Sequence, residues 1–447
     1  MRCSSAVLAA AFALAAAGAG AQDPARIKID SYALPNGLRV QLVEDHSSQV
    51  VAVDLWYDVG ARNEVAGHTG FAHLFEHMMF QGSKNLKKVE HSSLIERAGG
   101  RDNASTQYDV TNYFEFLPSN RLNLALWLEA ERMRGLNVTP EGLKNQVEAV
   151  KEERRLRVDN QPYSKAIWEG TLLAFDSKNC FGYGHSLIGS MAELDAAKVE
   201  DVQAFFKMYY APNNVTLTVV GDFNPAEARK FIEEYFGGIP RQPAPPPVVC
   251  DQKLHTGAMR QQMTDDKATL PAVIALYHVP STSSADLPAL ELLSTILGSG
   301  ESSRLNKVLA RDTKAALAAQ TLLNPFGPRR GPGMLIGLAI ANQGVGVDSV
   351  EKLLTREITQ VAQTGVTTEE LTKAKNQYRA GKMEERQRAF ALAEAVQFAN
   401  TYLGSPDAVN TDLERYAKVT VDDIKRVAAS YLTADNSLTI TIVPEKK

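Results

Sequence analysis

Runs of apolar residues near the start of the chain predict a set of β-strands. Apolar residues dominate 38–43 and 50–57, and the tripeptide Pro35-Asn36-Gly37 before the first run is typical of a turn. The region 101–116 is rich in threonine and aromatic residues, which predicts a strand pair or one long strand. The segment 71–80 differs, because nearly every position that is not His or Glu is apolar, as in a largely buried helix.

A further helix is predicted over 143–158, shortly after the region of strands. Thr139 and Pro140 precede it, and they supply the capping side chain and the first-turn proline that begin many helices. Leu143, Val147 and Val150 recur at helical spacing and form its apolar stripe. This stripe fixes which of the neighbouring polar side chains turn toward the protein interior.

Two distant stretches of the chain repeat the same order of elements. Residues 201–222 and 423–443 each read as a helix, an Asn-containing turn and a β-rich strand, at an offset of 222 residues. Between them, 240–247 is rich in proline and predicts a stiff, extended linker. We therefore expect an internal duplication, with an N-terminal domain over 27–238, a linker over 239–252 and a homologous C-terminal domain over 253–447.

Composition excludes some classes of partner. The 447 residues include 48 basic and 52 acidic ones, and the net charge is −4. A chain with this balance lacks the basic surface that nucleic acids or anionic lipids require. The length suggests two or three domains, which agrees with the predicted duplication.

The first 21 residues have the pattern of a secretory signal peptide. Arg2 precedes an apolar run over 6–17, and Ala19-Gly20-Ala21 predicts cleavage after Ala21. Export is therefore expected, to the periplasm of a Gram-negative bacterium; a mitochondrial presequence is the alternative, although it would be richer in arginine and serine. Cys180 and Cys250 remain after cleavage, and either one disulfide or two buried free thiols fits the sequence.

The candidate chemistry lies in the buried helix, in the sequence His73-Leu74-Phe75-Glu76-His77. Residues at i, i+3 and i+4 share one face of a helix, so the three polar side chains converge. Burying two imidazoles and a carboxylate without partners costs several kcal/mol, and a metal ion is the simplest common partner. A chance pattern on an ordinary solvated face is the alternative, which the surrounding apolar residues disfavour.

This H-x-x-E-H segment resembles the active-site helix of the pitrilysin family of zinc metallopeptidases, which includes insulysin and the mitochondrial processing peptidase. The resemblance implies an α+β fold of two homologous domains, each a sheet covered by helices. It also implies one Zn²⁺ per chain, held by His73, His77 and a glutamate some seventy-odd residues further on, with Glu76 as the general base. Glu153 lies at the border of the apolar stripe and Glu152 opposite it, so Glu153 is the predicted third ligand and Glu152 the runner-up.

The resemblance also implies a substrate site. Asn103 and Ala104 match the family segment G-G-x-x-N-A-x-T, which in relatives forms an edge strand where a peptide adds as a further strand; an ordinary core strand is the alternative. Gln146 stands where some relatives carry a second glutamate, so it can hydrogen-bond but supplies no charge.

The second half departs from the family in one respect. In relatives an arginine, followed seven residues later by a tyrosine, reaches the substrate. Arg311 fits the first position, but Ala318 occupies the second. We therefore expect a dimer in which a second member of the family supplies the missing pair.

These inferences together predict an exported zinc metalloendopeptidase that hydrolyses short or unfolded peptides. Glu76 would take the proton from a zinc-bound water. The alternative is a non-catalytic family subunit, a scaffold or chaperone-like partner, but such subunits usually lose a ligand or the base. Metal storage or sensing is a third reading, and it does not require Glu76.

Overall fold

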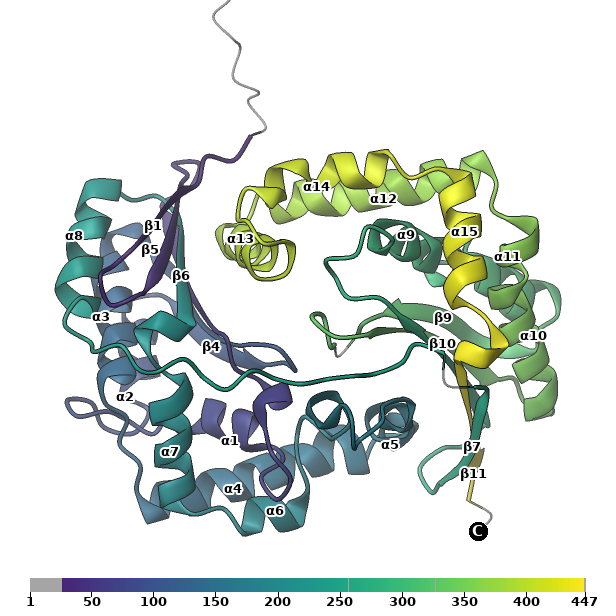
Figure 1. Ribbon diagram of the computed structural model, residues 1–447, viewed down its shortest axis with the longest axis horizontal. Helices are drawn as coiled ribbons and strands as arrows, with labels where there is room; N and C mark the ends of the chain where they lie inside the picture. Colours follow the sequence, from purple (N-terminus) through teal and green to yellow (C-terminus); the bar gives the residue numbers. More distant parts are fainter. Residues whose placement is uncertain (1–25, 256, 326, 446–447) are drawn as a thin grey trace, which may run out of the picture.

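The computed structural model describes residues 26–255, 257–325 and 327–445. The predicted signal peptide, over residues 1–21, lies outside these ranges. The chain builds two sheets, each covered by helices, which form the left and right halves of the molecule in Figure 1. The predicted α+β class with two similar sheet-and-helix units is confirmed.

The first sheet has six strands in the order β1-β2-β6-β3-β5-β4. Only β2 and β6 pair in parallel, and the other neighbours are antiparallel. The strands are β1 (Asp30–Ala33), β2 (Arg39–Glu44), β3 (Val50–Tyr57), β4 (Arg101–Thr106), β5 (Thr111–Pro118) and β6 (Val215–Gly221). The predicted strand pair over 101–116 is therefore β4 and β5, and β4 lies at an edge of the sheet.

The second sheet has five strands in the order β7-β11-β8-β10-β9. Here too a single pair, β7 with β11, is parallel. The strands are β7 (Met259–Asp265), β8 (Ala272–Val279), β9 (Ala316–Leu323), β10 (Gly333–Ala341) and β11 (Ser437–Pro444). The strand orders of the two sheets correspond when β2 is matched with β7. On this matching, β9 is the counterpart of the edge strand β4.

The helices divide between the two halves of the chain. The first half contains α1 (Phe71–Met78), α2 (Glu90–Arg97), α3 (Leu122–Arg134), α4 (Pro140–Arg154), α5 (Ser164–Trp168), α6 (Met191–Asp195), α7 (Val199–Tyr209) and α8 (Pro225–Phe236). The second contains α9 (Leu287–Gly298), α10 (Val347–Thr359), α11 (Val361–Thr364), α12 (Thr368–Glu385), α13 (Ala389–Leu403), α14 (Ala408–Ala417) and α15 (Val421–Tyr431).

The predicted internal duplication is visible in matching local structure. Helices α7 and α15 begin and end 222 residues apart, and β6 and β11 follow them at the same offset. Asn214 and Asn436, in the intervening turns, make equivalent bonds. Asn214 Nδ2 donates to Tyr209 O at 2.9 Å, and Asn436 Nδ2 donates to Tyr431 O at 2.7 Å.

Each half also covers one face of the other half's sheet. Helix α13 packs against β3 and β6 of the first sheet, where Gln397 Nε2 donates to the backbone oxygens of Asp54 and Thr216. Reciprocally, the segment 163–183 packs against the second sheet; a Cβ added at Gly170 would lie 3.0 Å from Ile440 Cδ1. Figure 1 shows α13 between the two halves. The exchange fixes the two sheets relative to one another.

The proline-rich segment runs between the halves as an extended stretch of chain, coloured teal in Figure 1, and it forms neither helix nor strand. A disulfide joins Cys180 to Cys250 and ties the end of this segment to the first half. The structure thus selects the disulfide from the two states that the sequence left open. Within the described residues, no helix has the length and apolarity needed to cross a membrane.

Candidate metal centre

Helix α1 is held at its N-terminus by a buried carboxylate. Glu64 Oε2 accepts from Gly70 N at 2.8 Å, and Glu64 Oε1 accepts from Ala72 N at 2.7 Å. His185 Nε2 lies 2.9 Å from Glu64 Oε2. Burial raises the pKa of Glu64, and the hydrogen bond from His185 acts against this rise. A carboxylate at a helix N-terminus interacts favourably with the helix dipole, so Glu64 fixes the turn that carries the first histidine of the motif.

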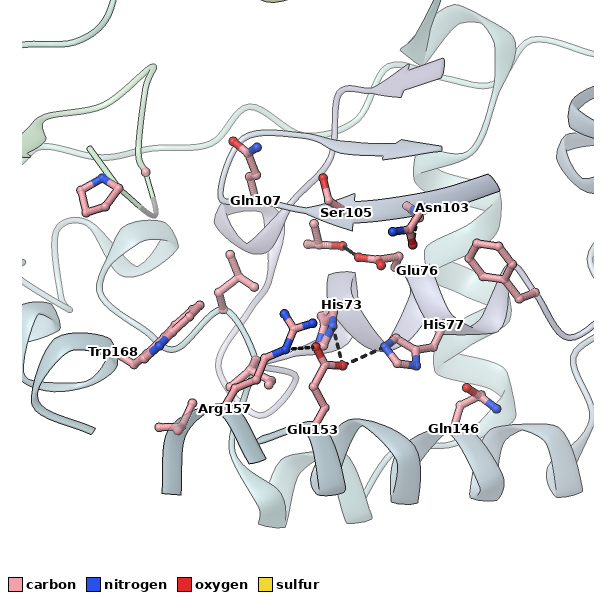
Figure 2. A pocket seen from close by; sticks show the side chains of 18 of the residues that line it. His73, Glu76, His77, Asn103, Ser105, Gln107, Gln146, Glu153, Arg157 and Trp168 are labelled. Atoms are coloured by element: carbon pink, nitrogen blue, oxygen red, sulfur yellow. Dashed lines mark hydrogen bonds and ion pairs between the residues drawn. The ribbon is translucent and has the colours of Figure 1, made fainter. Parts of the chain in front are cut away.

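The predicted ligands converge from two helices. His73 and His77 project from α1, and Glu153 projects from α4 (Figure 2). Glu153 Oε2 lies 3.4 Å from His73 Nε2 and 3.2 Å from His77 Nε2, and the candidate donor atoms all lie within 4.8 Å of one another. Glu152, by contrast, is exposed and pairs with Arg155 at 2.9 Å. The helical phase predicted from sequence therefore places Glu153, and not Glu152, at the cluster.

The protonation of two of these groups suits a metal. Burial, followed by the neighbouring His77, lowers the pKa of His73 to about 4, so its imidazole is neutral at pH 7. The hydrogen bond from His77 lowers the pKa of Glu153 despite its partial burial. Two imidazole nitrogens and one carboxylate that converge on one point form a donor set that Zn²⁺ prefers. These residues therefore fit a zinc ion with an open fourth position.

Glu76 lies beside the cluster without joining it. In Figure 2 its carboxylate lies between the histidines and strand β4. Thr106 Oγ1 donates to Glu76 Oε2 at 2.6 Å. Burial raises the pKa of Glu76, and the hydrogen bond from Thr106 partly offsets this rise. A carboxylate with a raised pKa next to an open metal position has the placement that a general base requires.

The cluster opens into a cavity of about 660 Å³ between the two halves of the chain. One part of the wall is the edge strand β4, and another part comes from the loop that follows β9. The wall residues are Asn103, Ala104, Ser105 and Thr106 on β4, and Asn324, Pro325, Gly327 and Arg329 on the loop. Both halves of a single chain thus enclose the site.

The cavity includes some of the predicted substrate residues and omits another. Asn103 and Ala104 line it from an edge strand, where a peptide can add. Gln146 also lines it and interacts with the His77 imidazole. Arg311 lies in the helical turn 306–312 with an exposed side chain and is not among the lining residues. Its substrate role stays a prediction, to which this cavity adds no support.

Several residues of the site were not predicted, among them Thr106, Arg157 and Arg329. Thr106 is the last residue of the G-G-x-x-N-A-x-T match, so the motif contained a signal for it. Arg157 Nε lies 3.1 Å from Glu153 Oε1 at the i+4 position, which helical spacing could have indicated. Arg329 reaches the cavity only because two halves of the chain meet, and no local pattern indicates that.

A second buried cluster has metal-ligating groups but already contains a cation. His91, Glu115 and Glu129 offer donor atoms within 4.8 Å of one another. The Arg132 guanidinium lies among them, bonded to Glu129 and 3.7 Å from Glu115 Oε1. Since this guanidinium already supplies the positive charge, the His73 cluster is the better candidate metal centre.

Comparisons with known proteins agree with the motif. The sequence model of the insulinase family, peptidase family M16, matches residues 39–174. The model of the M16 inactive domain matches residues 196–378. The zinc protease PqqE of Helicobacter pylori is 30% identical over 422 residues, which are 93% of this chain and 93% of that protein.

Solved structures give the same result. The crystal structure of a protease from Helicobacter pylori has a TM-score of 0.87 and 28% identity, and the match covers 94% of this chain and 100% of that one. The first half of the periplasmic protease PqqL from Escherichia coli, with a TM-score of 0.75, 20% identity and coverage of 94% and 92%, shares the fold. The whole of PqqL is matched over 47% of its length. Because the likeness in sequence extends over almost the whole chain, the protein belongs to the M16 peptidase family, the pitrilysin and insulinase group.

Proposed function

We propose that this protein is a zinc metalloendopeptidase whose site consists of His73, Glu76, His77 and Glu153. The observation that carries the proposal is the convergence of these four side chains beside an exposed edge strand in one cavity. Relatives named zinc proteases support the same chemistry. A non-catalytic subunit is the alternative, but such a subunit would not need a base placed next to a complete set of three metal ligands.

The residues of the chain have distinct tasks in this reaction. His73, His77 and Glu153 would hold the zinc ion, which when bound polarises the scissile carbonyl and lowers the pKa of water. Glu76 takes a proton from the attacking water and delivers it to the leaving amine. Thr106 holds the Glu76 carboxylate in place. The free backbone groups of β4 pair with the substrate backbone and align the scissile bond.

The size of the cavity favours short or unfolded substrates. About 660 Å³ is within the usual range of ligand pockets and is too small for a folded domain. A segment bound along β4 must also be extended, because only an extended backbone completes a strand. We therefore assign unfolded segments and short peptides as substrates.

We further propose that the protein acts in the periplasm. The disulfide between Cys180 and Cys250 suits an oxidising compartment. The PqqL structure with the same fold is of a periplasmic protease. Expression of the full chain with an epitope tag, followed by fractionation, tests this: recovery in the cytoplasmic fraction, with free thiols, would contradict it.

A dimer is the proposed assembly. The match covers 47% of PqqL, so that polypeptide is long enough for two units of this size. A second family member would provide the corresponding unit here. Sedimentation of the purified chain, with peptidase assays before and after adding candidate partners, tests the assembly. A monomer that is fully active alone would overturn it.

The catalytic proposal is tested with the wild-type protein and the Glu76→Gln variant, each analysed for zinc and for hydrolysis of a quenched-peptide library. We expect about one zinc per chain in both and a loss of 10²-fold to 10⁴-fold in kcat for the variant. Zinc in both proteins without hydrolysis in either would favour the non-catalytic subunit.

A further inference from the structure

Apart from the residues of the candidate metal centre, the charged side chains that line the cavity are positive. The charged lining residues, apart from the histidines, are Glu76, Glu153, Lys88, Arg157 and Arg329. Glu153 is a candidate ligand and Glu76 the candidate base, so neither is available to neutralise a substrate. Arg157 is paired with Glu153. The remaining charges in the cavity wall are positive.

Arg329 is held in position by its backbone. Its N–H donates to Asp109 Oδ2 at 2.7 Å, and its carbonyl oxygen accepts from Thr282 N at 2.8 Å. Asp109 is fully buried and also accepts from Tyr183 Oη at 2.6 Å. These bonds attach the loop of the second half to the first half. The Arg329 side chain therefore starts from a fixed point on the cavity wall.

The Arg329 guanidinium has aromatic neighbours, and it also interacts electrostatically with Glu291, which lines an adjoining cavity. It lies 5.2 Å from the centre of the Phe398 ring and 6.0 Å from that of Tyr402. Among the residues that the structure describes, it makes no salt bridge, whereas the adjacent Arg330 pairs with Asp58 at 2.5 Å. Arg329 as a whole is half-buried. A positioned guanidinium in a cavity wall that forms no salt bridge with the described residues is suited to bidentate recognition of a carboxylate.

Arg329 also lies where a bound peptide would leave the edge strand. It lines both the catalytic cavity and an adjoining cavity of about 520 Å³, and Gln107 and Asn324 line both as well. Gln107 directly follows Thr106, the last residue of β4. A peptide paired with β4 and continuing past its end therefore meets the guanidinium.

We propose that Arg329 is a specificity-determining residue that binds a carboxylate of the peptide substrate, so that the site selects peptides with an acidic group on this side of the scissile bond. The proposal rests on the peptidase function proposed above. The carboxylate is either an Asp or Glu side chain or the C-terminus of a short peptide.

The test compares quenched peptides that differ only in charge. A neutral parent with an amidated C-terminus is compared with versions carrying one Glu at successive positions on either side of the scissile bond, and with the parent bearing a free C-terminus. For the wild type we expect kcat/KM to rise about 10-fold or more for at least one carboxylate position. A rise on Glu substitution identifies a side-chain site, and a rise with the free C-terminus identifies a terminal one.

Substitutions at Arg329 test whether this residue causes the preference for peptides with a carboxylate. Arg329→Gln should abolish the preference, so that this variant cleaves the carboxylate peptides and the neutral parent with similar kcat/KM, while Arg329→Lys should restore part of the preference. Arg330→Gln is the matched control, because that neighbouring arginine pairs with Asp58 outside the cavity, and it should keep the preference. A wild type that is indifferent to peptide charge, or a preference that survives in Arg329→Gln, would overturn the proposal.

A binding measurement separates this proposal from the peptidase function. Zinc-loaded Glu76→Gln is titrated against fluorescent forms of the same peptides, with and without Arg329→Gln. If the carboxylate peptides bind about 10-fold tighter only when Arg329 is present, the carboxylate site stands even if the wild type hydrolyses nothing. Hydrolysis without charge discrimination in either assay supports the peptidase function and rejects the role of Arg329.

Discussion

Thr106 Oγ1 donates a 2.6 Å hydrogen bond to Glu76 Oε2, and this bond connects the edge strand β4 to the candidate base on helix α1. A peptide that pairs with β4 is thereby placed in a fixed register with the carboxylate that would take a proton from the attacking water. If Glu76 is the base, we therefore expect this one threonine to couple substrate alignment to the orientation of the base.

Replacing Thr106 by valine should reduce catalysis while leaving the metal in place. The variant keeps the shape of the side chain but removes the hydroxyl, and a hydrogen bond to a charged group contributes about 1.5–3 kcal/mol. We expect kcat to fall between about 10-fold and 100-fold, with zinc content unchanged. Since this hydrogen bond lowers the pKa of Glu76, the acid limb of the kcat/KM profile should move to higher pH.

Thr106→Ser is the control, because it retains the hydroxyl, and it should keep most of the activity. Equal loss in both variants would mean that packing of the threonine methyl, and not the hydrogen bond, matters at this position.

The two adjacent glutamates of α4 should differ sharply in their effect on the metal. Glu153 faces the histidines, whereas Glu152 is exposed beside Arg155. Removing one of three protein ligands should abolish stoichiometric zinc binding in Glu153→Gln, and Glu152→Gln should retain about one zinc per chain. Elemental analysis after gel filtration measures both. Zinc retained in Glu153→Gln and lost in Glu152→Gln would identify Glu152 as the third ligand.

Glu64 should affect both stability and metal affinity from outside the metal centre. Glu64→Gln leaves a single acceptor oxygen for two backbone N–H groups and removes the negative charge at the N-terminus of α1. We expect a loss of about 1–3 kcal/mol in unfolding free energy and weaker zinc binding, since His73 lies in the first turn of that helix. Chelator competition and urea unfolding measure the two effects.

The exposed Glu96 on α2 provides a control for the loss of one charge, and Glu96→Gln should alter neither quantity. If Glu64→Gln lowers stability but leaves the zinc dissociation constant unchanged, the carboxylate stabilises the helix without orienting the ligand.

Residues that interact within one element could be predicted from sequence. His73, Glu76 and His77 share a helix face, and the stripe of Val147 and Val150 correctly separates Glu153 from Glu152. The duplication was also predictable, because it repeats local patterns: helix, turn and strand recur at a constant offset. In each case the pattern involves only residues that are close together in the sequence.

Features that depend on the meeting of distant segments were not predictable. Helix α13 packs on the sheet of the other half, and Arg329 lines the same cavity as β4, although nothing in their local sequences indicates either arrangement. The pairing of Cys180 with Cys250 likewise depends on the path of the linker. The carboxyl pair of Asp54 and Glu394 belongs to the same class, since the two residues are brought together only by α13.

Asp54 and Glu394 form a buried carboxyl pair where α13 meets β3. Asp54 is fully buried, and within the described structure its Oδ2 has no donor partner. Burial, followed by the Glu394 charge, raises the pKa of Asp54 well above 3.8. Burial likewise raises the pKa of Glu394. The folded state should therefore bind a proton at this pair more tightly than the unfolded chain does.

Stability should consequently decrease with rising pH at this interface. Because the folded pKa of Asp54 lies above its unfolded value, the contribution of the pair is complete below about pH 4 and is lost as the pH rises through the folded pKa. Asp54→Asn supplies a permanent N–H donor toward Glu394. It should reduce the slope of the unfolding free energy against pH by up to about 1.4 kcal/mol per pH unit, the limit for one proton.

Urea unfolding of wild type and Asp54→Asn between pH 5 and 8 tests this, with the exposed Asp312→Asn as control for the change in net charge. Wild type and control should lose stability in parallel as the pH rises, and Asp54→Asn should lose less and exceed both at the alkaline end. Parallel curves for all three proteins would show that no proton is shared at this interface. A steeper loss in Asp54→Asn would mean that Glu394 takes up the proton instead, because the amide then presents its oxygen to a protonated Glu394 and not its N–H group to the carboxylate.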